Sequence, residues 1–164
     1  MAAGTRSQRE YPERPMVGVG AVIVDGARVV VVRRAAPPLK DKWSIPGGLV
    51  ELGETLRAAA TREALEETGL AVEAGEILEV VERVYPDAGG KTQYHYVLVD
   101  FLCRPLSGDL RAAGDAADAR WITLDELARF PIADSAAAVL RKGLLRAGAD
   151  RGERFLAETT DPEA

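Results

Sequence analysis

Three glutamates, Glu63, Glu66 and Glu67, stand at positions i, i+3 and i+4 of a segment rich in alanine and leucine. If this segment is helical, their carboxylates share one face. They also lie in the last turns before Gly69, where the negative end of the helix dipole disfavours them and where they repel one another. Arg62, four residues before Glu66, offsets only part of this cost. Helix stability alone does not select such an arrangement.

A divalent cation would account for the three carboxylates, because carboxylate oxygens are hard ligands that suit Mg²⁺ or Mn²⁺. The turn Pro46-Gly47-Gly48 precedes the helix, and its glycines allow close approach of a backbone whose carbonyls can complete a metal shell. A bound metal lowers the pKa of water and neutralises charge on a phosphoryl centre. The alternative is a solvated acidic helix face without any ligand, which is what charge runs usually are.

The segment from Gly48 to Leu70 resembles the signature of the Nudix hydrolases (MutT-like proteins), G-x5-E-x7-R-E-U-x-E-E-x-G-U, in which U is aliphatic. Every fixed position is filled, by Gly48, Glu54, Arg62-Glu63-Ala64, Glu66-Glu67 and Gly69-Leu70. The resemblance continues upstream through VVVVRRAAPPLKDKWSIPGG and downstream in ARWITLDEL.

The resemblance implies a Nudix fold, in which a mixed sheet is sandwiched between helices and the signature forms a loop-helix-loop. It also implies hydrolysis of a nucleoside diphosphate linked to another moiety, with Mg²⁺ or Mn²⁺ as cofactor. Carried over residue by residue, it assigns metal binding to Glu63, Glu66, Glu67 and the Gly48 carbonyl. Arg62 and Glu54 match positions that orient these glutamates.

The reaction needs a carboxylate that takes a proton from the attacking water. Glu63 is the first candidate, because it lies nearest the middle of the helix and matches a residue with that role in some family members. Other members use an acidic residue outside the signature, and Asp115 and Asp118 are available in GDAADARW. Asp118, three residues before Trp121 and near a strand end, is the better placed of the two. The alternative for both is that they only solvate a loop.

Candidates for substrate binding are basic residues that flank the path into the signature, namely Arg33, Arg34, Lys40 and Lys42. His95, the only histidine, alternates with Tyr94 and Tyr96 on a predicted strand and is a further candidate for a ribose or phosphate contact. The alternatives are a surface position for the cations and a half-exposed strand position for His95. Trp43 could stack on a base, but a core position is expected for it.

Within the family, the loop AAPPLKDKWSIPGGLVE looks most like that of ADP-ribose and related nucleoside diphosphate-sugar hydrolases. The runner-up is a nucleoside triphosphate pyrophosphatase, including one that removes oxidised dGTP; a dinucleoside polyphosphate hydrolase ranks lower. Two other classes stay open: a nucleotide-sensing domain that does not cleave, and an isoprenoid diphosphate isomerase. The isomerase would need an active-site cysteine, for which Cys103 on a late strand is a poor match.

The elements that position these residues follow from local patterns. A helix is predicted for residues 55–68, ended by Gly69; another begins at Thr123, where Glu126 completes a capping box; a last helix covers residues 135–145. Asp25-Gly26 predicts a hairpin turn. Strands are predicted at 17–24, 28–33, 43–45, 77–85, 93–103 and 119–122. This order, without a regular strand-helix repeat, predicts an α+β fold with a layered α/β/α arrangement.

The whole chain has 164 residues and a net charge of −5, which fits one domain. We expect a domain over 15–146 between a flexible N-terminal tail (1–14) and an acidic C-terminal tail (147–164). The acidic balance disfavours duplex nucleic acid as a partner, and no apolar run approaches a membrane span. One cysteine and no signal peptide favour the cytoplasm. A homodimer through AAAVLRKGLLRA is one expected assembly, although the chain's own core would use those residues equally well.

Overall fold

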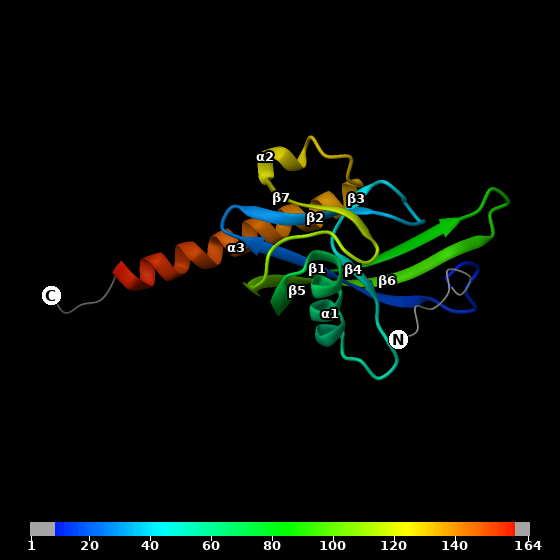
Figure 1. Cartoon of the computed structure of the whole chain (residues 1–164), viewed down its shortest axis with the longest axis horizontal. Helices are drawn as coiled ribbons and strands as arrows, with labels where there is room; N and C mark the ends of the chain where they lie inside the picture. The colour runs from blue at the N-terminus through cyan, green and yellow to red at the C-terminus, as the bar shows by residue number, and fades with distance from the viewer. Residues whose placement is uncertain (1–8, 160–164) are drawn as a thin grey trace.

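A computed structural model describes the backbone of residues 9–159 and the side chains of residues 9–151. The chain forms seven strands and three helices within this part (Figure 1). In chain order they are β1 (Met16–Asp25), β2 (Arg28–Arg34), β3 (Trp43–Ser44), β4 (Gly47–Leu49), α1 (Leu56–Thr68), β5 (Ala71–Pro86), β6 (Thr92–Ser107), β7 (Ala116–Thr123), α2 (Leu124–Leu127) and α3 (Asp134–Thr159).

The strands form one mixed sheet in the order β3-β2-β1-β6-β5, with β4 paired to β1 and β7 paired to β2. Strands β1 and β6 run parallel, whereas the other pairs are antiparallel. Gly20 in the middle of β1 pairs with Asp100 of β6 on one side and with Gly47 of β4 on the other. Strand β1 therefore lies between β4, where the signature begins, and the long β5–β6 hairpin.

Two apolar clusters cover opposite sides of the sheet and confirm the predicted α+β sandwich. One contains the buried alanines of α1, Ala59, Ala60 and Ala64, packed on β1 and β6. Because alanine side chains are small, they let α1 lie close to the sheet. The other contains Val139 and Leu140 of α3, packed on β1, β2 and β7. The helix that carries the glutamates is thus held against a rigid sheet.

The predicted helix at 55–68, the capping box at Thr123 and the hairpin after β1 are confirmed. Three elements differ most from the prediction, and β6 and β7 are a few residues longer than expected. Strand β4 was not predicted, because a three-residue strand with two glycines carries no alternating pattern. Strand β5 begins at Ala71 rather than near residue 77. Helix α3 continues to Thr159, well past the predicted end at residue 145.

The segments predicted as tails are partly ordered against the domain. Tyr11 donates its backbone N–H to the Gln93 carbonyl at 2.8 Å, and Tyr94 donates its hydroxyl to Glu10 at 2.7 Å. At the other end, Arg151 donates to the Gly26 carbonyl at 2.5 Å. Residues 1–8 and 160–164 of the predicted tails lie outside the described residues.

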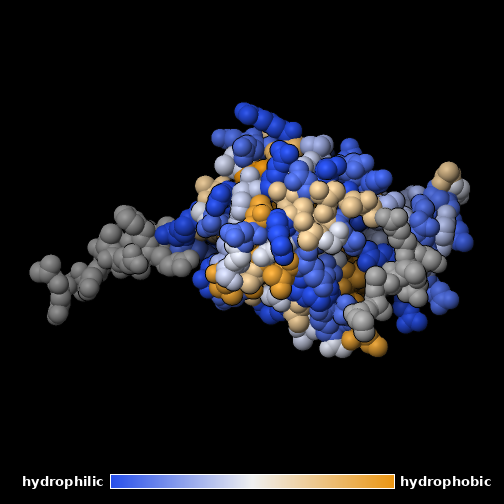
Figure 2. Space-filling view, in the orientation of Figure 1, coloured by the Kyte–Doolittle hydropathy of each residue, from blue (hydrophilic) through white to orange (hydrophobic). Residues whose placement is uncertain are grey.

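Most large apolar residues of the last helix pack on the chain's own sheet. Val139, Leu140 and Leu144 are all less than 8% exposed, so they are not available to a second copy, whereas Leu145 is 61% exposed. One exposed leucine does not make an interface, and the predicted homodimer stays a prediction. In the described chain, no helix is long and apolar enough to cross a membrane. The face in Figure 2 is largely hydrophilic, with small apolar patches between charged side chains.

Candidate active site

Helix α1 begins and ends with specific caps that fix the position of its glutamates. Thr55 accepts a hydrogen bond from the Ala58 N–H at 3.1 Å, and Gly69 takes the left-handed conformation, with φ 73°, that ends the helix. The loop before β7 covers the helix end, since Arg111 and Ala113 donate their N–H groups to the last carbonyls at 2.9 and 3.2 Å. These hydrogen bonds also hold the loop that contains Asp115 against the end of α1.

Strand β4 lies directly against two of the glutamates. The Gly47 N–H donates to Oε2 of Glu67 at 3.0 Å. A Cβ atom at Gly47 would lie 2.0 Å from the Val19 carbonyl oxygen, and one at Gly48 would lie 2.3 Å from Oε1 of Glu63. Position 47 therefore requires glycine, because the clash is with backbone, whereas a side chain at position 48 would displace the Glu63 carboxylate. This is the close backbone approach that the sequence predicted.

Arg62 is the centre of the hydrogen-bond network around the signature. It donates to both carboxylate oxygens of Glu54, at 2.7 and 2.9 Å, in the two-pronged geometry that a guanidinium favours. It also donates to Glu63 at 2.8 Å and to Glu66 at 3.2 Å. The guanidinium lowers the pKa of Glu54, and the carboxylates raise the pKa of Arg62. Arg62 and Glu54 thus hold the glutamate face in one geometry.

The two inner glutamates have raised pKa values. Burial is the main cause for both, and it raises the pKa of Glu67 to about 8. The Gly47 N–H and Arg34 lower this pKa, whereas the charges of Glu63 and Asp115 raise it. For Glu63, burial is offset in part by Arg62. Glu67 therefore holds a proton near neutral pH unless a cation replaces it.

The predicted metal ligands are not all brought together. Glu63 is 13% exposed and Glu67 7%, and both line one cavity, but Glu66 is 54% exposed and bound to Arg62. Among the described side chains, no group of three His, Cys, Asp or Glu residues is arranged to hold a metal. The donor chemistry nevertheless fits Mg²⁺ or Mn²⁺, because two carboxylates and glycine backbone oxygens are hard ligands.

The cavity beside Glu63 and Glu67 has a volume of about 410 Å³ and lies between the sheet, the 35–42 loop and the start of α3. Several predicted residues line it: Arg34, Lys42, Gly48, Glu63, Glu67 and Asp115. Trp43, at 9% exposed, forms part of its wall and packs edge-on against Phe130 at 5.1 Å, so the expected core position for Trp43 is confirmed.

Other predicted residues do not line this cavity. Asp118 instead accepts from the Ala119 N–H at 2.8 Å and pairs with Arg120 at 3.2 Å. Of these two acids only Asp115 lines the cavity, because the loop that contains it is hydrogen-bonded to the end of α1. We therefore prefer Asp115 to Asp118 as the acid outside the signature. Arg33 pairs with Asp41 at 3.6 Å.

His95 and Cys103 are also absent from the cavity wall. Tyr96 lines the cavity, and because successive strand residues face opposite sides of a sheet, His95 points away from it. Cys103 is 2% exposed in the cluster under α1, and burial raises its pKa to about 12. This thiol is not placed for the chemistry that an isomerase would need.

Among the polar cavity residues that sequence reasoning did not assign are Arg83, Tyr96 and Asp100. All three come from the β5–β6 hairpin, far from the signature in sequence. The available signal was Asp100, an acid inside the otherwise apolar strand pattern HYVLVDFLC.

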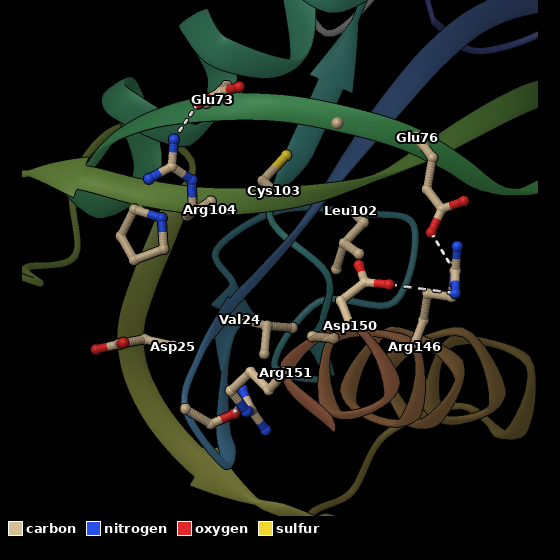
Figure 3. Close-up of a pocket in the computed structure, with 14 residues that line it drawn as sticks. Val24, Asp25, Glu73, Glu76, Leu102, Cys103, Arg104, Arg146, Asp150 and Arg151 are labelled. Atoms are coloured by element: carbon tan, nitrogen blue, oxygen red, sulfur yellow. Dashed lines mark hydrogen bonds and ion pairs between the residues drawn. The ribbon is translucent and has the colours of Figure 1, made fainter. Parts of the chain in front are cut away.

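A second cavity, of about 580 Å³, lies between the β1–β2 turn, the β5–β6 hairpin and α3 (Figure 3). Its acids and bases neutralise one another: Glu73 pairs with Arg104, and Arg146 bridges Glu76 at 2.7 Å and Asp150 at 3.3 Å. Because these acids are paired with arginines, the glutamate cavity is the better candidate for chemistry.

Comparison with known proteins places this fold in one class. A family model described as the NUDIX domain matches residues 14–143, and the chain therefore belongs to the Nudix family. The crystal structure of a MutT NUDIX hydrolase from Burkholderia pseudomallei is 32% identical, with a TM-score of 0.69, over 79% of this chain and 98% of that one.

Two curated relatives carry different activities in their names. An ADP-ribose pyrophosphatase of Methanocaldococcus jannaschii is 32% identical over 116 residues, which is 71% of this chain and 66% of the relative. A Mycobacterium tuberculosis protein, provisionally named 8-oxo-dGTP diphosphatase 2, is 39% identical over 65% of this chain and 80% of its own length. The chain thus spans slightly under two thirds of the first relative.

Proposed function

We propose that this protein hydrolyses, with a divalent metal, the diphosphate linkage of a nucleoside diphosphate derivative. The observation that supports this most directly is the pair Glu63 and Glu67, which lies against the glycine backbone of β4 at the wall of a cavity. Two buried carboxylates with raised pKa values are costly unless a cation joins them. Family membership agrees with this chemistry.

The metal would be held by Glu63, Glu67 and the Gly48 carbonyl. Glu66 would join them by leaving its exposed contact with Arg62, which costs little because that side chain is 54% exposed. When bound, Mg²⁺ or Mn²⁺ would supply charge neutralisation at phosphorus and a more acidic water. Arg62, still bound to Glu54 at 2.7 Å, keeps the helix face in place.

The chain's own cations would meet the diphosphate. Arg34 and Lys42 line the same cavity as the two glutamates, and Arg34 is close enough to Glu67 to lower its pKa. Glu63 is the first candidate for the carboxylate that takes the proton of the attacking water, and Asp115 is the second. Both line the cavity, which is the first requirement for a general base.

ADP-ribose, or a related nucleoside diphosphate-sugar, is the substrate we put first. The M. jannaschii relative, named for ADP-ribose, supports this choice. A nucleoside triphosphate, including oxidised dGTP, is the second candidate, because the M. tuberculosis relative has the higher identity, 39%.

A substrate panel with Mg²⁺, followed by chromatography of the products, tests the proposal. It contains ADP-ribose, other nucleoside diphosphate-sugars, diadenosine polyphosphates and nucleoside triphosphates with 8-oxo-dGTP. We expect AMP and ribose 5-phosphate from ADP-ribose, with kcat/KM of roughly 10⁴ M⁻¹s⁻¹ or more. Release of pyrophosphate from a triphosphate would move the activity to the second candidate. Nucleotide binding without any cleavage would overturn the proposal and favour a sensor.

A further inference from the structure

Asp100 is a buried acid that the proposed hydrolysis does not use. It lies in the middle of β6, is 4% exposed and lines the cavity. Its strand neighbour is Gly20, where a Cβ atom would lie 2.1 Å from Oδ1 of Asp100. The carboxylate therefore occupies space that only a glycine leaves open.

The carboxylate of Asp100 makes no side-chain hydrogen bond within the part of the chain that the structure describes. The charges that act on it are Arg83, which favours its ionised form, and Glu79, which opposes it. Burial raises its pKa to about 6, so it is mostly ionised at pH 7 and above. Among the described residues, no fully buried side-chain oxygen or nitrogen lacks a partner, so the unpaired oxygens of Asp100 are open to the cavity. A ligand that brings N–H or O–H donors into the cavity would pair with them.

The position of Asp100 relative to the glutamates suggests which part of a nucleotide it meets. Strand β1 separates it from Gly47, whose N–H binds Glu67. Two strand spacings put the Cα atoms of Asp100 and Gly47 roughly 10 Å apart. Asp100 and the glutamates thus lie at different places in the same cavity. If the phosphates bind near the glutamates, another part of the substrate would lie near Asp100.

The walls around Asp100 suit a flat aromatic ring. Ile45, Val81, Leu98 and the Tyr96 ring line the same cavity, and a Cβ atom at Gly20 would lie 3.1 Å from Cγ2 of Ile45 as well as close to Asp100. Apolar side chains with few polar groups are the usual lining of a pocket that orients a planar ligand.

We propose that Asp100 accepts a hydrogen bond from the exocyclic amino group of the substrate's nucleobase and so determines base specificity. This inference rests on the proposed function, because it assumes a nucleotide in the cavity. An ionised carboxylate only accepts hydrogen bonds. A base with an amino group at the contacted position satisfies it, whereas a keto oxygen there would repel it. Sugar hydroxyls are the competing donors, and the experiment separates the two.

The test measures kcat/KM on nucleotide pairs that differ in one exocyclic amino group: guanine with hypoxanthine, adenine with purine, and cytosine with uracil. The phosphate part is that of the best panel substrate, and the pH is about 8, where the Asp100 carboxyl is ionised. We expect the wild type to prefer the amino member of at least one pair by roughly tenfold to a hundredfold, as for a charged hydrogen bond. Asp100→Asn should reduce this preference to about threefold or less.

Two further variants accompany Asp100→Asn. Glu79→Gln makes the same chemical change on the neighbouring strand, at a residue paired with Asp100 but outside the cavity wall, and it should keep the preference. Gly20→Ala pushes the Asp100 carboxylate aside and should lose the preference. Thermal melting shows whether each variant is folded, so loss of selectivity is read only from folded protein.

Three results would overturn the inference. They are a wild type with no amino preference in any pair, a folded Asp100→Asn that keeps the preference, and a variant that instead changes the ratio between ribose and deoxyribose substrates. The proposed function fails differently, because then the wild type cleaves no member of any pair. The two failures are thus distinguishable.

Discussion

At the scale of single residues, the site is defined by carboxylates whose charges are poorly compensated inside the fold. Glu67 is the extreme case, with a pKa of about 8 caused mainly by burial. Glu63 and Asp115 add repulsion, and the single Gly47 N–H compensates only in part. Such a residue weakens the metal-free protein, which is typical of groups kept for function rather than stability.

Glu67→Gln should therefore stabilise the metal-free protein at alkaline pH while it removes most hydrolysis. The folded pKa of Glu67, about 8, lies above its usual value of 4.5. The folded state thus holds this proton more tightly, and the stability it contributes is lost as pH rises from about 4.5 to about 8. Thermal melting against pH with a chelator should show this decline in the wild type and a flatter curve in Glu67→Gln.

The same Glu67→Gln variant is also tested for hydrolysis, with Glu82→Gln as the control. We expect kcat/KM with Mg²⁺ to fall by roughly a hundredfold or more in Glu67→Gln. Glu82→Gln changes an exposed carboxylate of β5 and should behave as the wild type in both measurements. A Glu67→Gln protein with full activity would remove Glu67 from the metal site.

Arg62→Lys tests whether Arg62 acts through its hydrogen-bond geometry or only through its positive charge. A lysine keeps the positive charge but cannot bind both oxygens of Glu54 and also reach Glu63. We expect kcat to fall by roughly tenfold to a hundredfold with a smaller change in KM, because Arg62 lies behind the glutamates rather than in the cavity wall. Equal activity of Arg62→Lys and wild type would show that charge alone suffices.

The sequence allowed the glutamates to be predicted but not their unequal placement. Spacing puts Glu63, Glu66 and Glu67 on one helix face, yet only packing against β4 decides that Glu67 is buried and Glu66 exposed. In the same way, the sequence favoured Asp118 over Asp115 because Asp118 lies nearer a strand end, whereas only Asp115 lines the cavity. The contact of the 108–115 loop with the end of α1 distinguishes them, and no local pattern encodes that contact.

At the scale of elements, strand β4 joins the glutamate helix to the sheet. It has three residues and pairs with β1. This pairing depends on Gly47, because a Cβ atom at this position would collide with the Val19 carbonyl oxygen. From the sequence, Gly47-Gly48 could be predicted as a tight turn but not as part of a strand. A three-residue strand is specified by its partner rather than by its own periodicity.

Gly47→Ala should disrupt both stability and activity. The added Cβ would lie 2.0 Å from a backbone atom that no side-chain rotation can move away, so β4 must shift and Glu67 loses its N–H donor. We expect a melting temperature lower by roughly 5–10 °C and hydrolysis reduced by at least about tenfold. Gly89→Ala is the matched control, because its Cβ would lie 3.4 Å from Asp87 in an exposed turn. Normal melting of Gly47→Ala would contradict this account of β4.

At the scale of the whole molecule, the domain was predicted to end at residue 146, but α3 continues beyond it. Ala147 packs partly on the cluster under α3, and Arg151 reaches the β1–β2 turn. Neither residue lines the glutamate cavity. A chain that ends at residue 146 should therefore keep kcat/KM within about twofold and melt a few degrees lower. Loss of hydrolysis by this truncated, folded chain would show that the domain needs residues 147–164.

Metal, protonation and global stability should be linked through Glu67. A cation that binds only the folded protein raises its melting temperature, but it must first displace the Glu67 proton, which is held with a pKa of about 8. The stabilisation by a fixed Mg²⁺ concentration should thus be larger at about pH 8.5 than at about pH 6.5, because metal affinity follows ligand deprotonation. Glu67→Gln should lose most of this difference, whereas Glu82→Gln should retain it. Stabilisation by Mg²⁺ that is equal at both pH values in the wild type would mean that the ion binds without Glu67, and the ligand set would then have to be sought among Glu63, Glu66 and Asp115.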